Sequence, residues 1–171
     1  MANHGSQHTL VPIKSTLLQG SLDATLKLRL VFKFLLGALQ TYYDNKNTVI
    51  EPQYHYLDKY MLHQLYHFHK QIQSLYKKYQ YHNVGKEIVN FITNDVSAIY
   101  CHLIKDRLYC EKMDSPYRLG AVDVVGVVLA ICVRSVAPIL PHLAEEVWLH
   151  HPENLSKVLN ICNYVLTYIH D

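Results

Sequence analysis

The order of apolar and polar positions along the chain predicts a series of helices. Between residues 21 and 43, with Asp23 near the start, apolar residues recur every four positions at Leu22, Leu26, Leu30 and Phe34. The stretch 56–80 steps by four and three, as helices in a bundle do, at Leu57, Met61, Leu65, Phe68, Ile72, Leu75 and Tyr79. Both patterns are typical of amphipathic helices.

A third, longer helix is predicted from about residue 83 to residue 112. Asn83 is a favourable N-cap, and the positions expected to face inward are Ile88, Ile92, Val96, Ile99 and Leu103. The turn MDSPYR follows. Ser115 before Pro116 is the cap-then-proline order that begins many helices, so a fourth helix is expected from there to about residue 136.

The segment 104–118 carries seven charged side chains between apolar neighbours. On the last turns of the predicted third helix, Arg107 and Glu111 lie one turn apart, a spacing at which opposite charges pair. The segment could be a catalytic cluster, a nucleic-acid contact or the solvated end of a buried helix.

Two prolines predict the boundary between the fourth helix and a fifth. Pro138 must end the fourth helix, and Pro141 suits the first turn of the fifth. In the fifth helix two glutamates come early and two histidines late, the order that the helix dipole favours: Glu145, Glu146, His150 and His151.

These elements divide the chain into three parts. Residues 1–20 have no sustained period and mix glycine, serine and proline with polar residues, which predicts a poorly ordered leader. Residues 21–152 hold the helices, and nothing in the chain is β-rich, so we predict an all-α, antiparallel helical bundle. Residues 153–171 are a divergent helical tail, apolar enough to need a docking surface, with helical spacing at Leu155, Val158, Leu159, Ile161, Cys162, Val165 and Ile169.

Composition narrows the functional classes. The chain has 171 residues, half of them hydrophobic, which is enough for one core. Its net charge of +2 is too small to indicate nucleic-acid binding, so that role would need locally clustered charge. The four cysteines form no C-x-x-C pair, which favours a reducing compartment. The longest apolar run, 124–133, has about half the length that spans a bilayer, so no membrane partner is expected.

Candidate catalytic and metal-binding residues are few. There is no glycine-rich phosphate loop and no G-x-S-x-G motif, so we assign the chain no catalytic residue and no cofactor. His63 and His67 have the spacing of metal ligands on one helix face, but the residues between them, QLY, lack the glutamate of an H-E-x-x-H site. We therefore expect this pair to face solvent and the chain to hold no metal.

Tyrosines and lysines interleave along the second predicted helix, and two interpretations are open. Tyr66, Lys70, Tyr76 and Lys77 could stack on unpaired bases and hold phosphates. Alternatively, tyrosine fills the half-buried margins of a bundle, which is the interpretation that the residues alone favour.

Two stretches resemble a known family. AIYCHLIKDRLYCEK and, after it, VRSVAPILPHLAEEVW resemble a paired signature of the anticodon-binding helical domain of class I isoleucyl-tRNA synthetases, of the bacterial and mitochondrial type. The resemblance extends from about Asp23 to His151. In that family a Rossmann domain activates isoleucine with ATP, while the helical bundle binds the anticodon arm. The resemblance implies these structural signature residues: Lys105, Asp106, Arg107, Pro138, Pro141, His142, Glu145 and Glu146.

The resemblance also implies a partner, the isoleucine tRNA. Residues 27–39 read KLRLVFKFLLGAL, where the family usually reads K-x-R-N-T-x-R-F-L-L-G-N-L, so Arg29 matches and Lys33 replaces an arginine. Because lysine cannot make a bidentate guanidinium contact, anticodon specificity is expected to be poor. We predict weak, salt-dependent binding through the candidate contacts Arg29, Lys33, Lys70, Lys77 and Arg107.

The family's HIGH-type and KMSKS-type ATP motifs, its editing domain and its zinc module are not found in this sequence. We therefore expect the chain alone to be inactive and to serve aminoacylation only within a full-length enzyme, to which ATP and zinc would belong. The resemblance implies the mitochondrial matrix, or the cytoplasm if no targeting signal is present. The alternative function is a helical protein-interaction module or decayed fragment without RNA binding, with residues 154–171 mediating self-association or binding a protein.

Overall fold

The computed structural model describes residues 15–43 and 51–152, and every regular element within them is a helix. The predicted all-α class is therefore confirmed. The predictions for residues 1–14 of the leader and for the tail, residues 153–171, lie outside the described residues. In chain order the elements are α1 (Ser15–Tyr43), α2 (Tyr56–Lys77), α3 (Tyr81–Asn90), η2 (Phe91–Cys101), α4 (Lys105–Tyr109), α5 (Pro116–Val136) and α6 (Pro141–Leu149).

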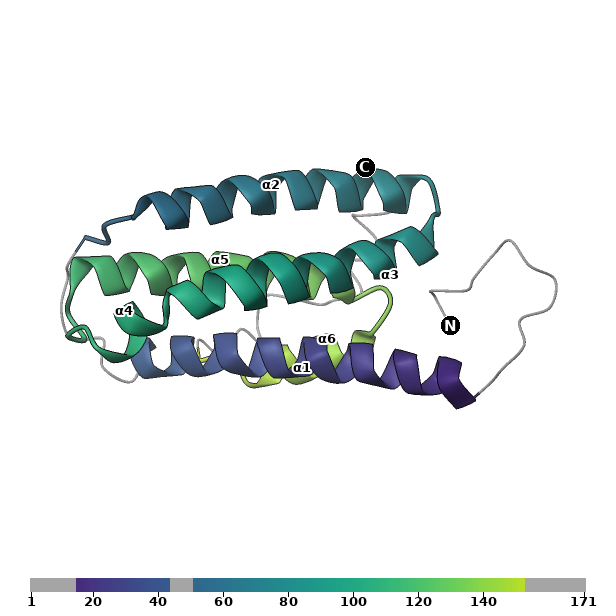
Figure 1. The fold of residues 1–171 in the computed structure, drawn as a ribbon, viewed down its shortest axis with the longest axis horizontal. Coiled ribbons are helices and arrows are strands. Elements are labelled where there is room, and N and C mark those ends of the chain that lie inside the picture. The colour runs from purple at the N-terminus through teal and green to yellow at the C-terminus, as the bar shows by residue number, and fades with distance from the viewer. Residues whose placement is uncertain (1–14, 44–50, 153–171) are drawn as a thin grey trace.

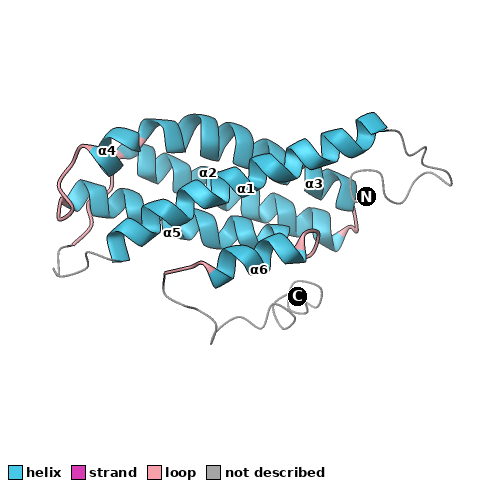
Figure 2. Ribbon diagram, turned by 90° about the horizontal axis from the view of Figure 1, so that it is seen from below, coloured by secondary structure: helices cyan, strands magenta, loops and turns pink. Residues whose placement is uncertain are grey.

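The long helices lie side by side along one axis, with α4 at one end of the bundle (Figure 1). α1 and α2 both pack on α5, and they lie on opposite sides of it. α6 runs along α1 (Figure 2). α5 is thus the central helix, which explains why its sequence is apolar on nearly every side.

α5 is also the one described helix that is long and apolar enough to cross a membrane by length and composition alone. Its most apolar stretch is 67% buried inside the bundle. Contacts with α1, α2 and α4 therefore account for its composition.

Prolines set the helix boundaries as predicted. Ser115 is the N-cap of α5 and Pro116 its first residue, and α5 ends at Val136, before Pro138. α6 begins at Pro141. The two glutamates of α6 lie beyond its first turn, so they do not occupy the place that the dipole argument predicted.

The apolar row predicted for α2, which steps by four and three residues and which we call its seam, is largely confirmed. Met61, Leu65, Phe68 and Ile72 are buried, and Phe68 stacks on Phe91 of η2 with the ring centroids 4.1 Å apart. Tyr79, the last predicted member of the seam, lies beyond the end of α2, and its side chain is 65% exposed.

The face of α1 that the spacing predicted is wrong. The helix begins at Ser15 rather than Ser21, and the leucines that face the core are Leu28, Leu35 and Leu39, together with Phe32. Leu22, Leu26 and Leu30 are exposed instead. A step of four residues drifts by about 40° per turn around a helix of 3.6 residues per turn. Such a row therefore winds away from the core.

The third helix is not the single α-helix that was predicted. It begins at Tyr81 after Gln80, so Asn83 is not its N-cap, and from Phe91 to Cys101 it is a π-helix. A π-helix bonds i to i+5 and takes more residues per turn. The inward positions consequently advance to Tyr100 and Ile104, which are buried, whereas the predicted Ile99 and Leu103 are 40% and 54% exposed.

The segment before α2 is held against the start of α5. The Gln53 N–H donates to the Pro116 carbonyl over 2.9 Å, and the Tyr54 hydroxyl donates to Asp123 over 2.7 Å. A Cβ at Gly120 would lie 2.1 Å from the Gln53 carbonyl oxygen, so only glycine permits this approach. The contact fixes where α2 begins.

Candidate nucleic-acid interface

The predicted basic residues do not form one face. Arg29 and Lys33 belong to α1, whereas Lys70 and Lys77 belong to α2, on the other side of α5 (Figure 1). All four side chains are exposed. The structure therefore divides the candidate contacts into two separate clusters.

In the α1 cluster, Arg29 forms an ion pair with Glu146 of α6. The two side chains are 58% and 40% exposed, so water screens their attraction. The pair borders a hollow of about 450 Å³ between α1 and α6, whose lining includes Leu143, Val147 and His150. Glu146, predicted only as a structural residue, thus holds the one arginine that matches the family at this helix.

Lys33 lies between that hollow and a second one. The second hollow has a volume of about 540 Å³ and is bounded by α1, α4 and the first turns of α5. Within the described residues, Lys33 has no ion-pair partner. Its ammonium is therefore available to an anion.

The second hollow has an apolar floor and an aromatic edge. Phe34, Leu108 and Met113 line it, and Tyr109 at its margin is 72% exposed. Arg118 also lines it, but this side chain is buried and donates to the Glu111 carbonyl over 3.2 Å. An exposed tyrosine beside a lysine is the combination that binds unpaired nucleotides, by stacking and by phosphate contact.

The α2 cluster is different. The Lys70 ammonium lies 4.6 Å from the centre of the Tyr66 ring, a cation–π arrangement that occupies one face of that ring. The Tyr76 hydroxyl donates to the Ser135 carbonyl over 2.7 Å. Tyr76 therefore fills a margin of the bundle, as the second interpretation predicted.

His63 and His67, two of the histidines of α2, are exposed, as predicted. The Nε2 atoms of His63 and His67 lie 3.1 Å apart. In the described part of the chain, no group of three or more metal-ligating side chains includes them.

Arg107, predicted both as an RNA contact and as a signature residue, is tied to Asp58 of α2. Its Nη1 donates to Oδ2 over 2.8 Å and its Nη2 to Oδ1 over 2.5 Å. Asp58 is fully buried, and the Arg107 side chain is 12% exposed. This pairing favours the structural role of Arg107, while its contact with RNA stays a prediction.

Asp58 accepts two further hydrogen bonds. The Tyr100 hydroxyl of η2 donates to Oδ1, and the His55 N–H donates to Oδ2, each over 2.8 Å. One carboxylate thus joins the start of α2 to η2 and α4. The expected ion pair of Arg107 with Glu111 is not formed, because Arg107 pairs with Asp58, and Glu111 accepts the Ser115 hydroxyl.

The charges of this network follow from its contacts. Burial alone would raise the pKa of Asp58, but the hydrogen bonds from Arg107, His55 and Tyr100 outweigh it and hold the pKa below its usual value. Burial would lower the pKa of Arg107, and the hydrogen bond with Asp58 raises it. Burial and the Asp58 charge raise the pKa of Tyr100, which stays a neutral donor.

The remaining signature residues take other positions. Lys105 and Asp106 are exposed on α4, and His142 and Glu145 are exposed on α6. The sequence interpretation missed Asp58 and Tyr109. Asp58 had a detectable signal, since it lies three residues after His55, where a carboxylate accepts the N-cap N–H of a capping box.

Comparison with known proteins identifies the family. The family described as "Anticodon-binding domain of tRNA ligase" matches residues 58–164, a range that runs into the segment predicted to be a divergent tail. An isoleucine–tRNA ligase of Desulforudis audaxviator is 39% identical over 135 residues, 79% of this chain and 14% of the relative. The mitochondrial isoleucine–tRNA ligase of Macaca fascicularis is 39% identical over 144 residues, 84% of this chain and 14% of the relative.

A third relative, the isoleucine–tRNA ligase of Limosilactobacillus reuteri, is 36% identical over 141 residues, 81% of this chain and 15% of the relative. The chain thus spans about a seventh of the length of the curated relatives it matches. Bacterial and mitochondrial relatives are similar to it to the same degree. The chain belongs to the family of tRNA-ligase anticodon-binding domains, and the three relatives named above are isoleucine–tRNA ligases.

Proposed function

We propose that this domain binds the anticodon arm of isoleucine tRNA through the α1 cluster, Arg29 and Lys33, and through the hollow bounded by α1, α4 and α5. The observation that carries the proposal is the position of Lys33, exposed between two hollows on a helix whose family pattern is basic at this residue. Family membership supports a tRNA as the ligand, and the names of the relatives support isoleucine tRNA.

Each group in the site has a distinct task. Lys33 and Arg29 contact phosphates, while Tyr109 stacks on an unpaired base at the edge of the apolar hollow. Arg29 reaches a phosphate only by leaving Glu146. Because that ion pair is exposed, the exchange costs little.

We propose that aminoacylation requires a longer enzyme of which this domain is a part. The relatives that it matches are about seven times longer. Purified chain should give no isoleucine-dependent pyrophosphate exchange, and exchange above a blank without protein would contradict this. We also propose the mitochondrial matrix as its compartment, because some of the relatives are mitochondrial enzymes. Fractionation of cells that express the endogenous gene can check this.

The test of RNA binding compares the two clusters. Retardation of isoleucine tRNA is measured in gels over a range of salt for wild type, for Lys33→Gln with Tyr109→Ala, and for Lys70→Gln with Tyr66→Ala. The first variant should bind about tenfold or more weakly, and its salt slope should fall by about one phosphate contact. The second variant is the matched control and should bind as wild type does.

Two results would contradict the proposal. One is an absence of retardation for the wild-type chain even at low salt. The other is an equal loss of affinity in both variants, which would mean that the α1 cluster has no special role. Circular dichroism confirms that each variant keeps its helicity.

A further inference from the structure

α1 carries a row of exposed leucines, most of which have no role in the proposed RNA site. Leu18, Leu22, Leu26 and Leu30 lie one turn apart, and their side chains are 57%, 51%, 45% and 66% exposed. We call these four residues the leucine ridge. Four neighbouring leucines form a continuous apolar strip, which on a protein surface marks a contact.

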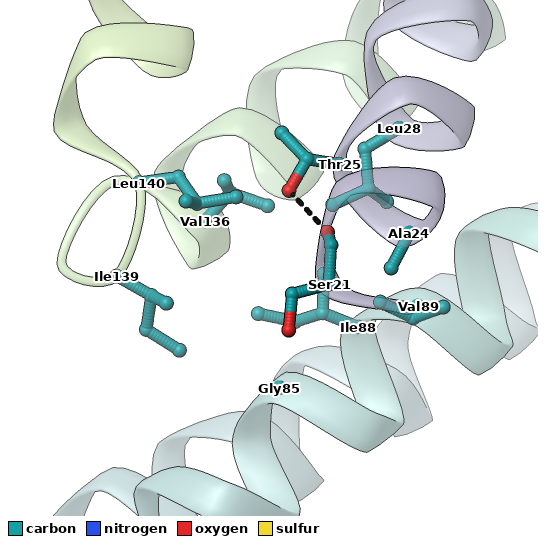
Figure 3. A pocket seen from close by; sticks show the side chains of 10 residues that line it. All are labelled: Ser21, Ala24, Thr25, Leu28, Gly85, Ile88, Val89, Val136, Ile139 and Leu140. Carbon is teal, nitrogen blue, oxygen red and sulfur yellow. Dashed lines mark hydrogen bonds between the residues drawn. The ribbon is translucent and has the colours of Figure 1, made fainter. Parts of the chain in front are cut away.

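α6 lies beside the ridge and runs in the same direction as α1. At its start, Leu140 and Thr25 line one pocket of about 150 Å³ (Figure 3). At its end, His150 and Lys33 line another. The described chain therefore leaves the bundle at Pro152 near the Lys33 end of the ridge, and Leu149 close by is 72% exposed.

The segment that follows has a matching apolar face. Residues 155–169 lie outside the described part of the chain, and their sequence repeats apolar side chains at helical spacing: Leu155, Val158, Leu159, Cys162, Val165 and Ile169. As a helix this segment would be about 21 Å long, and the ridge from Leu18 to Leu30 is about 18 Å long. The two lengths agree.

We propose that residues 155–169 dock on the leucine ridge of the same chain as a helix antiparallel to α1. Pro152 cannot continue α6, and residues 153–154 make the reversal. Because the chain leaves the bundle near Lys33, only the antiparallel direction carries the segment along the ridge toward Leu18. The occupant is thus the chain's own tail.

Cysteine cross-linking tests the register of this docking. If Leu155 lies opposite Leu30, Cys162 lies about 10 Å further along, beside Leu22 and Leu26. The variants are made in the whole 171-residue chain carrying Cys110→Ser, which removes the exposed thiol at the end of α4. In that background a short bismaleimide should join Cys162 to the thiol of Leu26→Cys within one chain. The matched control is Gln71→Cys, which is exposed on α2, and its cross-linked product should be at least tenfold less.

Thiol labelling gives an independent measurement in the same background. Cys101 and Cys132 are buried, and burial raises the pKa of Cys101 to about 12, so at neutral pH the reporter is Cys162. Leu26→Glu should speed its labelling at least fivefold by displacing the tail. Leu103→Glu, at an exposed leucine that lines neither of the hollows bordered by Leu30, should leave the rate unchanged.

Each result decides the proposal. An internal cross-link at residue 26 together with faster labelling in Leu26→Glu supports it. A cross-link between two chains would assign the ridge to a second copy and overturn it. Equal cross-linking at residues 26 and 71, or equal labelling in wild type and Leu26→Glu, would show that the tail is not docked.

Discussion

Arg29 and Arg107 each pair with a carboxylate, but the two pairs lie in different surroundings. Arg107 meets a fully buried Asp58 that accepts four hydrogen bonds in all. Arg29 meets Glu146 on the surface, where about half of each side chain is exposed. The buried pair therefore fixes the backbone around it, while the exposed pair is free to exchange its carboxylate for another anion.

The difference follows from solvation. In the buried network each charge has lost its water and depends on its protein partners, so removing one partner leaves an uncompensated charge. On the surface, water replaces a lost partner at little cost. The same two functional groups thus serve architecture at one end of the bundle and, by our proposal, recognition along α1.

The largest effect is expected from Asp58→Ala. This change leaves the Arg107 guanidinium without its partner and frees the Tyr100 hydroxyl, and it should lower the free energy of unfolding by about 3 kcal/mol or more. Urea denaturation followed by circular dichroism measures it. Glu146→Ala is the surface counterpart, and an equal loss in the two variants would remove the distinction between the pairs.

The pH dependence of the free energy of unfolding gives a second test of the buried pair of Asp58 and Arg107. Because the folded state lowers the pKa of Asp58, the stability that this carboxylate supplies is fully present above its ordinary pKa of 3.8. That stability is lost as the pH falls through the lower, folded value. The advantage of wild type over Asp58→Asn in urea should therefore hold from pH 7 to about 4 and shrink below it. An advantage that begins to shrink near pH 6 would contradict this assignment.

Tyr100→Phe should have a smaller effect. It removes one hydrogen bond to the charged carboxylate while keeping the buried ring, at a cost of about 1.5–3 kcal/mol. The free energy of unfolding from urea curves checks this. Tyr109→Phe, at an exposed tyrosine of α4, should be neutral.

The smallest stability effect is expected from Glu146→Gln. The exposed pair contributes about 0.5 kcal/mol or less, so unfolding should barely change. The variant frees Arg29 and removes a negative charge beside the proposed RNA site, so isoleucine tRNA should bind two- to fivefold more tightly at low salt. Glu145→Gln, its exposed neighbour, controls for net charge alone, and an equal gain there would contradict a specific role for the pair.

Local chemistry accounts for the parts of the fold that the sequence predicts. Pro116, Pro138 and Pro141 mark the ends of α5 and α6 because a proline lacks the N–H that a helix interior needs. The apolar seam of α2 is a single stripe with lysines elsewhere, so its buried face is evident from spacing. The all-α class and the family follow from such patterns.

Other features depended on which surfaces meet. α1 has leucines on several sides, so its own spacing does not decide which of them is buried, and contacts with α5 and α6 select Leu28, Leu35 and Leu39. The π-helix turns Tyr100 inward where an α-helix would place Ile99. The spacing along the chain made Glu111 the expected partner of Arg107. In the fold, Arg107 pairs with Asp58 of α2 instead.

The candidate site shows the same division. The sequence by itself determined that Arg29 and Lys33 lie one turn apart on one helix, because that spacing is local. Only the tertiary structure decided that Lys70 and Lys77 lie across α5 from them and that Glu146 reaches Arg29. Spacing along a helix is set by the backbone repeat, whereas the neighbours of a side chain are set by how whole helices pack.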